Sequence, residues 1–181
     1  MKNNLKEILT PTIVLFVICV VVSALLGLTN FMTEDKIAEV QAENAAKTRM
    51  LVLPEADEFT QEGEYYVGLK GGEVVGYVFE TEAGGYGGKV KVMTGISAEG
   101  EIMGISILSH SETPGLGANA TKESFTDQFK QPAAELEVVK NQAAAEGQIE
   151  AMTGATITTK AVANAVNEAV AIFESVAKGG N

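Results

Sequence analysis

The chain contains the stretch Thr153-Gly154-Ala155-Thr156-Ile157-Thr158-Thr159, which precedes its most strongly patterned segment. Apolar residues recur from Val162 to Val176 at the i, i+3, i+4 spacing of an amphipathic helix. Either Thr158 or Thr159 is the expected N-cap of this helix, because a threonine hydroxyl accepts a hydrogen bond from a first-turn N–H group. Taken alone, the stretch is typical of an ordinary helix cap. Its small residues also leave room for a phosphate at the positive end of the helix dipole.

The N-terminal region predicts one membrane-spanning helix over residues 10–31. Residues 12–28 are apolar or small, and about 22 helical residues at ~1.5 Å rise each reach the ~30 Å thickness of a bilayer core. A cleaved signal peptide is the alternative, but its apolar core is usually only ~7–15 residues long. Lys2 and Lys6 precede the segment and several acidic residues follow it. This asymmetry predicts a single-pass cell-membrane protein with residues 1–9 in the cytoplasm and the C-terminal domain outside.

Composition restricts what the rest of the chain does. About 150 residues follow the span, enough for one domain with its own core. The formal net charge of −11 argues against nucleic acid as a partner. The single cysteine, Cys19, lies in the predicted span and the single histidine is His110, so no disulfide framework and no Cys- or His-based metal site is predicted. Any redox chemistry must therefore depend on an organic cofactor.

The region after the span predicts an α+β domain over residues 55–181, preceded by a stalk helix over residues 32–54. Thr33 is the expected N-cap of the stalk and Pro54 its end. Runs rich in Val, Tyr and Phe, separated by turn residues, predict an antiparallel sheet; the Gly71-Gly72 pair is a two-residue hairpin signal. Strands are expected at residues 64–70, 73–81, 89–96, 101–108 and 136–140. Helices are expected at residues 121–130 and in the C-terminal segment.

Two loops between these elements have the composition of ligand-binding segments. Residues 84–88, G-G-Y-G-G, combine Tyr86 with glycines that allow close approach to the backbone. Residues 110–117, H-S-E-T-P-G-L-G, contain a Pro-Gly turn signal and both polar and apolar side chains. Taken alone, each segment is also compatible with a simple turn. The candidates for contact with a ligand on the second loop are Glu112, Thr113, Gly115 and Leu116.

Residues 150–156, E-A-M-T-G-A-T, resemble the acceptor motif for covalent flavinylation. In that family the motif is an acidic residue, two variable positions, Ser or Thr, Gly, Ala and Thr, and a flavin transferase joins FMN through its phosphate to the final threonine. The resemblance implies a phosphoester between FMN and Thr156. Glu150 replaces the usual aspartate and retains its charge. Further cofactor-binding residues implied around the acceptor are Thr153, Gly154, Ala155 and Thr158.

The membrane span, the two loops and the acceptor motif, in this order, resemble the G subunit of the Rnf electron-transport complex over nearly the whole chain. The resemblance implies an FMN-carrying electron relay without a catalytic residue or complete active site of its own. It implies a complex of several membrane subunits that transfers electrons between ferredoxin and NAD and couples this transfer to sodium or proton translocation. A flavin transferase is the implied partner during maturation.

Besides a flavinylated sensor or reductase domain outside the Rnf complex, which the proteins that co-purify with it would distinguish, two alternatives remain open from the sequence. The C subunit of the sodium-translocating NADH:quinone reductase shares the FMN motif, but its corresponding glycine-rich loop carries a tryptophan, and this chain has none. The other alternative is a non-redox, membrane-anchored binding module in which residues 153–156 are only a helix cap. The presence or absence of a bound flavin distinguishes this second alternative from the relay.

Overall fold

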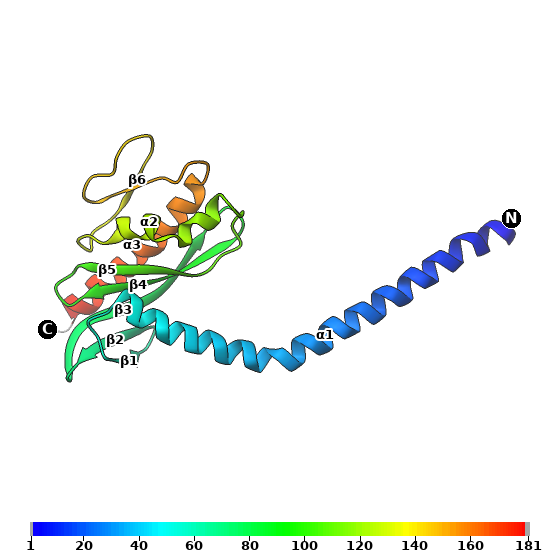
Figure 1. Ribbon diagram of the computed structural model, residues 1–181, viewed down its shortest axis with the longest axis horizontal. Coiled ribbons are helices and arrows are strands. Elements are labelled where there is room, and N and C mark those ends of the chain that lie inside the picture. Colours follow the sequence, from blue (N-terminus) through cyan, green and yellow to red (C-terminus); the bar gives the residue numbers. More distant parts are fainter. Residues whose placement is uncertain (1, 180–181) are drawn as a thin grey trace. The chain divides into compact units, whose positions relative to one another are not determined.

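The computed structural model describes residues 2–179. Met1, the first residue of the predicted cytoplasmic segment, and residues 180–181, the last of the predicted domain of residues 55–181, lie outside the described residues. A five-stranded antiparallel sheet has the order β1-β2-β3-β4-β5, and a separate pair, β6-β7, is parallel. The elements, in chain order, are α1 Lys2–Val52, β1 Glu58–Glu62, β2 Tyr65–Lys70, β3 Glu73–Gly84, β4 Lys89–Ser97, β5 Ile102–Ser109, η1 Gly117–Thr121, α2 Glu123–Thr126, η2 Asp127–Phe129, β6 Glu137–Val139, β7 Gln148–Glu150 and α3 Thr156–Gly179 (Figure 1). The predicted α+β class, with an N-terminal apolar helix and a C-terminal helix, is confirmed.

Helix α1 is continuous where two helices were predicted. It runs through Thr33, whose hydroxyl donates to the Thr29 carbonyl oxygen at 2.9 Å. The prediction of Thr33 as an N-cap was therefore wrong, because its side chain bonds back to the preceding turn of the same helix. Within α1, the segment Ile8–Glu34 is long and apolar enough to cross a membrane, with a mean hydropathy of 2.8. The chain divides into two compact units at residues 44 and 45.

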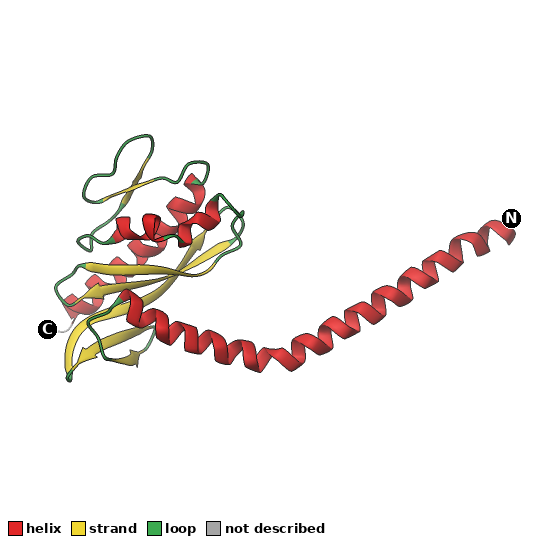
Figure 2. Ribbon diagram, in the orientation of Figure 1, coloured by secondary structure: helices red, strands yellow, loops and turns green. Residues whose placement is uncertain are grey.

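Helix α3 packs on one face of the sheet and forms the main core of the second unit (Figure 2). Side chains alternate between the two faces of a strand, and Phe79 and Val92 point toward this core. The buried Thr81 hydroxyl adds a hydrogen bond of 2.8 Å to the Ala165 carbonyl oxygen of α3. The helix buries most of the apolar face that the sequence pattern predicted, namely Val162, Val166, Ala169, Val170 and Phe173, whereas Val176 is half-buried. Ala161 and Ala165 are buried beside them.

The last turn of α1 packs on the opposite face of the sheet. Val52 and Leu53 are fully buried there together with Val78 and Met93. Glycines in three successive strands let the helix end approach the sheet backbone, because a side chain at Gly68, Gly76 or Gly95 would overlap Val52 or Leu53. A side chain at Gly104, in the next strand, would be in ordinary contact with Val52. The end of α1 is therefore part of the core of the unit that begins at Ala45.

Replacing Gly95 by alanine is expected to destabilise this unit, because the new Cβ would overlap the Val52 carbonyl group, which is backbone and cannot rotate away. Overpacking of this kind costs about 1–3 kcal/mol of unfolding free energy. Thermal unfolding of the full chain, followed by circular dichroism, measures the loss. Gly84→Ala is the matched control, since a Cβ there meets nothing within 4 Å. Equal unfolding temperatures for Gly95→Ala and the wild type would contradict this packing.

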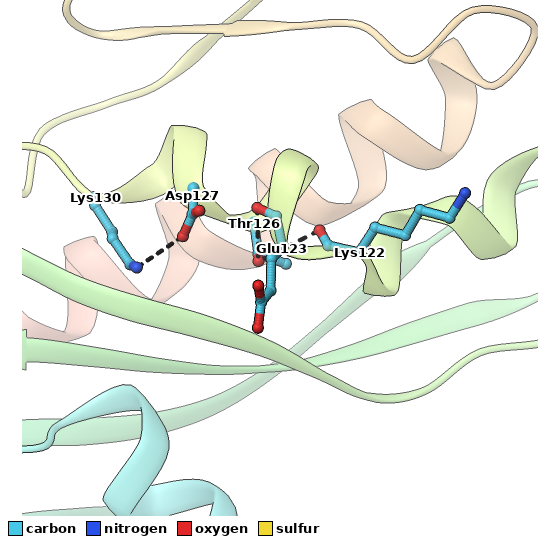
Figure 3. A network of polar contacts seen from close by, with 5 residues as sticks. All are labelled: Lys122, Glu123, Thr126, Asp127 and Lys130. Atoms are coloured by element: carbon cyan, nitrogen blue, oxygen red, sulfur yellow. Dashed lines mark hydrogen bonds and ion pairs between the residues drawn. The ribbon is translucent and has the colours of Figure 1, made fainter.

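The remaining predicted elements are mostly confirmed. The β2–β3 hairpin closes through Gly71 and Gly72, with φ angles of 59° and 88°, as a two-residue turn of this kind requires. The helix predicted over residues 121–130 is a single α-helical turn, α2, between two 3₁₀ turns. In this segment the Thr126 hydroxyl donates to the backbone oxygens of Lys122 and Glu123 (Figure 3). Strands β1 and β7 were not predicted, because both are short and β1 is almost entirely exposed.

Candidate functional site

One cavity of about 520 Å³ collects residues from three segments that are far apart in the sequence. Strands β3 and β5 both run antiparallel to β4, so their last residues lie at the same end of the sheet and the loops after them are neighbours. Helix α3 starts at this end as well (Figure 1). The residues that line the cavity are Tyr86, Glu112, Thr113, Leu116, Gly117, Gly154, Ala155, Thr156, Ile157 and Thr158.

The structure thus brings most of the predicted site residues together. Two predicted residues are not in the lining: Gly115, which occupies an exposed turn with a φ angle of 79°, and Thr153. Thr153 instead lines a second cavity of about 380 Å³, together with Lys122 and Glu150. Sequence reasoning missed Gly117 and Ile157. Ile157 directly follows Thr156 and lies on the exposed side of the helix, outside the pattern of buried apolar residues. An apolar residue outside that pattern was the signal in the sequence that could have identified Ile157 as a site residue.

The acceptor turn differs from its prediction at the helix start. Helix α3 begins at Thr156, so the expectation of an N-cap at Thr158 or Thr159 was wrong. Both hydroxyls are engaged elsewhere: Thr158 bonds to Glu112, whereas Thr159 donates to the Ala155 carbonyl oxygen at 3.0 Å and accepts from the Met152 N–H at 3.1 Å. The turn before the helix closes through the Ala155 N–H and the Met152 carbonyl oxygen, with a separation of 3.0 Å.

Exposure separates the threonines of this stretch. Thr158 and Thr159 are 1% and 0% exposed, whereas Thr156 is partly exposed and lines the first cavity. Thr153 is exposed but lies at the second cavity. Among the threonines of the acceptor stretch, Thr156 alone combines accessibility with a place in the cavity between the two loops.

Glu112 joins the three segments around the cavity. It is only 6% exposed. One carboxylate oxygen accepts a hydrogen bond of 3.0 Å from the Gly87 N–H, and the other accepts one of 2.6 Å from the Thr158 hydroxyl. Its own backbone N–H donates to Nδ1 of His110 at 3.2 Å. One side chain therefore holds the glycine-rich loop, the second loop and the first turn of α3 in a fixed arrangement.

The environment of Glu112 keeps its carboxyl group ionised. Burial is the largest single effect and by itself raises the pKa. The hydrogen bonds from Thr158 and from the backbone N–H groups of Gly87 and Tyr86, with the nearby His110, act in the opposite direction and together outweigh it, so the pKa of Glu112 is lowered from its ordinary value of 4.5. The cavity consequently contains a negative charge at neutral pH.

Three glycines enclose this carboxylate. A Cβ on Gly85 or Gly117 would overlap the carboxylate oxygens of Glu112, and a Cβ on Gly87 would overlap the backbone of Ser111. The glycines of both loops are therefore required by close packing around Glu112. This requirement is more specific than the conformational freedom that any glycine offers.

An apolar rim surrounds the polar floor of the cavity. The side chains of Tyr86, Leu116 and Ile157 are 73%, 45% and 54% exposed. Leu116 lies over Gly154, where an added Cβ would come within 3.2 Å of its side chain. Exposed apolar side chains that converge on a cavity are typical of a ligand site. The cavity thus offers an apolar surface suited to a planar aromatic ring and an accessible hydroxyl for attachment at one edge.

Comparison with known protein families gives two matches to different parts of the chain. The family model described as FMN-binding domain matches residues 85–171, which include the first loop from Gly85 onward, the whole second loop and the acceptor stretch. The family model described as RnfG N-terminal region matches residues 1–50. The region matched by the second model lies N-terminal to the region matched by the first.

Curated relatives match nearly the whole chain. The G subunit of a Na⁺-translocating ferredoxin:NAD⁺ oxidoreductase complex from Acetobacterium woodii is 39% identical over 96% of this chain and 95% of its own length. The G subunit of a proton-translocating ferredoxin:NAD⁺ oxidoreductase complex from Clostridium ljungdahlii is 38% identical, with coverage of 88% and 85%. The G subunit of an ion-translocating oxidoreductase complex from Methanosarcina acetivorans is 37% identical, with coverage of 93% and 95%.

Two solved structures share the fold. NqrC from Shewanella oneidensis superposes with a TM-score of 0.57 at 16% sequence identity, over 70% of this chain and 73% of that one. The C subunit of the Na⁺-translocating NADH-quinone reductase from Parabacteroides distasonis gives a TM-score of 0.55 at 23% identity, over 65% and 63%. At this level of identity, the likeness concerns the fold alone.

Proposed function

The chain belongs to the family of G subunits of ion-translocating ferredoxin:NAD oxidoreductase complexes, and from this premise we propose that it relays electrons on an FMN attached covalently to Thr156. Its cofactor is FMN, because the match to the FMN-binding domain family covers residues 85–171. It is one subunit of a redox enzyme complex with several subunits, anchored by the apolar helix of residues 8–34. The phosphoester, the contacts around it and the flavin transferase as maturation partner are our proposal.

The observation that carries the proposal is the position of Thr156. It is the accessible threonine of the acceptor stretch that lines the cavity, and it is the first residue of α3. The first N–H groups of a helix have no partner within it. A phosphate on this hydroxyl therefore lies beside the unpaired first-turn N–H groups and the positive end of the helix dipole, which it shares with the nearby Glu112 carboxylate.

The residues of the cavity have distinct parts in this proposal. FMN supplies one- and two-electron transfer when bound. Thr156 fixes its phosphate end, while Tyr86, Leu116 and Ile157 cover the ring through apolar contact, and Thr113 offers a hydroxyl at the cavity wall. Glu112 acts through the backbone of the glycine-rich loop and the first turn of α3, which it holds in place.

The alternatives have less support. The C subunits of the NADH:quinone reductase share the fold at 16% and 23% identity, whereas the relatives at 37–39% identity are G subunits of the ion-translocating complexes. A non-redox binding module does not account for a match to the FMN-binding domain family. Of the relatives, one is named for sodium and another for protons, so family membership is compatible with either coupling ion.

Denaturing electrophoresis tests the covalent link. The full chain, purified from a host that contains the flavin transferase, should show flavin fluorescence in the gel after boiling in detergent, because a phosphoester survives unfolding. A fluorescent native protein that loses all its flavin on denaturation would contradict the covalent link but not FMN binding. A protein that is colourless before denaturation would contradict the relay itself. Co-purification of other membrane subunits from the native host tests the assembly.

A reporter fusion tests the proposed orientation. The positive charges before the span predict a C-terminal domain outside the cytoplasm. An enzyme that is active only outside the cytoplasm, fused after Asn181, should therefore be active. The same enzyme fused before residue 1 should be inactive. Activity of the N-terminal fusion alone would reverse the proposed topology.

A further inference from the structure

The charges around the cavity at Thr156 are unusual for a site that binds a phosphorylated cofactor. Among the described residues that line it, none is Lys, Arg or His, and the one charged side chain is that of Glu112. Proteins commonly meet phosphate groups with Arg or Lys side chains. A free phosphomonoester such as that of FMN carries about −1.5 to −2 charge at pH 7. The lining of the cavity thus opposes the charge of free FMN.

The helix dipole does not compensate for this charge. The Glu112 carboxylate accepts the Thr158 hydroxyl bond at 2.6 Å, and Thr158 lies in the first turn of α3. A carboxylate at this place already benefits from the positive end of the helix. A second anion must share the same field with it and is repelled by it. The helix start is therefore a weaker phosphate site than its position alone suggests.

The nearest cation along α3 is Lys160, one turn beyond Thr156. Residues four apart lie on the same face of a helix, but Lys160 is exposed and does not line the cavity. Ion pairs between exposed groups contribute at most about fivefold to an equilibrium constant. The apolar residues Tyr86, Leu116 and Ile157, in contrast, present a surface for the flavin ring.

We propose that the cavity recognises the ring of a flavin and not its phosphate, so that without the covalent bond it takes riboflavin at least as readily as FMN. This inference rests on the proposed function and extends it to the class of ligand. It also gives the phosphoester a second purpose besides retention. The bond keeps the phosphate at a position that non-covalent contacts do not favour, and esterification leaves the phosphate with one negative charge instead of about two.

The test uses the full chain carrying Thr156→Ala, in nanodiscs of zwitterionic lipid, with empty nanodiscs as the blank. Riboflavin and FMN are titrated separately and their fluorescence anisotropy is recorded. We expect riboflavin to bind with a Kd equal to that of FMN or lower by up to about tenfold, and we expect added salt to reduce any difference because it screens the repulsion. A Kd for FMN that is lower than the Kd for riboflavin by more than the error of the titration would overturn the proposal. Absence of binding by both at the solubility limit of riboflavin would overturn it as well.

Two further variants in the same background separate ring from phosphate. Ile157→Ala should weaken both flavins by a similar factor, roughly tenfold, since it removes apolar cover. Lys160→Gln should leave riboflavin binding unchanged and weaken FMN by no more than about fivefold. A larger loss confined to FMN would assign the phosphate to Lys160 and contradict the proposal. These titrations are independent of the gel test, so recognition of the ring and covalent attachment can fail separately.

Discussion

Thr156→Ala is expected to abolish covalent FMN while leaving the domain folded. The substitution removes the hydroxyl that the flavin transferase would esterify, so no flavin fluorescence should remain with the chain after denaturation. Thr156 is partly exposed and none of the hydrogen bonds between described side chains involves its hydroxyl. Alanine is also a good helix former. The thermal unfolding of the unloaded variant should therefore match that of the unloaded wild type.

Thr153→Ala is the matched control for this variant. Thr153 occupies the other threonine position of the motif, is exposed and lies at the second cavity. We expect it to reduce flavin loading less, since it removes at most one hydrogen bond, worth about 0.5–1.5 kcal/mol, and not the acceptor. Flavin per chain, from the ratio of flavin to protein absorbance, measures both variants. Full loading of Thr156→Ala would show that the acceptor is another residue, and complete loss of flavin in Thr153→Ala alone would move the acceptor to Thr153.

Glu112→Ala is expected to destabilise the domain and to disorder the cavity. It leaves the Gly87 N–H and the Thr158 hydroxyl without their acceptor in a buried place. The unmet hydrogen bonds and the space left behind together cost about 2–5 kcal/mol. Glu112→Gln is the matched control, because its amide can accept from Gly87 and donate to Thr158. We expect it to lose only about 1 kcal/mol. Equal stability of Glu112→Ala and the wild type would show that the carboxylate does not hold the loops together.

The wild type and Glu112→Gln should also differ in how their free energy of unfolding depends on pH. The pKa of Glu112 is lower in the folded chain than its ordinary value of 4.5. A depressed carboxyl pKa contributes stability above the unfolded-state value, and this contribution is lost as the pH falls through the folded-state value. The stability difference between the wild type and Glu112→Gln should therefore be constant near neutral pH and shrink below about pH 4.5. Melting curves at several pH values measure it, and a difference that grows on acidification would contradict the ionised state.

The periodicity of apolar residues and the composition of the turns predicted the larger helices and strands, because these elements depend mainly on residues that are close together in the sequence. The strand patterns of residues 73–81 and 89–96 and the Gly71-Gly72 turn needed no tertiary information. The start of α3 was placed three or four residues late, because Thr158 and Thr159 look like capping residues but their hydroxyls bond to Glu112 and Met152. Only the folded chain reveals such partners, which lie far away in the sequence or across a turn.

For the cavity too, some features were predicted from the sequence and others were not. Motif reasoning found Thr156, Tyr86 and Leu116, which the structure places in one lining. It assigned Glu112 to direct contact with the cofactor, and whether that contact exists stays a prediction. Its hydrogen bonds to two other segments depend on the neighbouring ends of β3 and β5 and were not predicted. Likewise, a row of glycines below the end of α1 becomes meaningful only when the strand register is known.

Peptide mass spectrometry of the flavin-loaded chain tests the central claim most directly. Proteolysis after Lys140 and Lys160 yields one peptide that contains the whole acceptor stretch, and fragmentation of this peptide assigns the modified residue. We predict that the mass of an FMN phosphoester lies on Thr156. The same mass on Thr153, Thr158 or Thr159, or a peptide without it in a protein that is fluorescent after denaturation, would contradict the account.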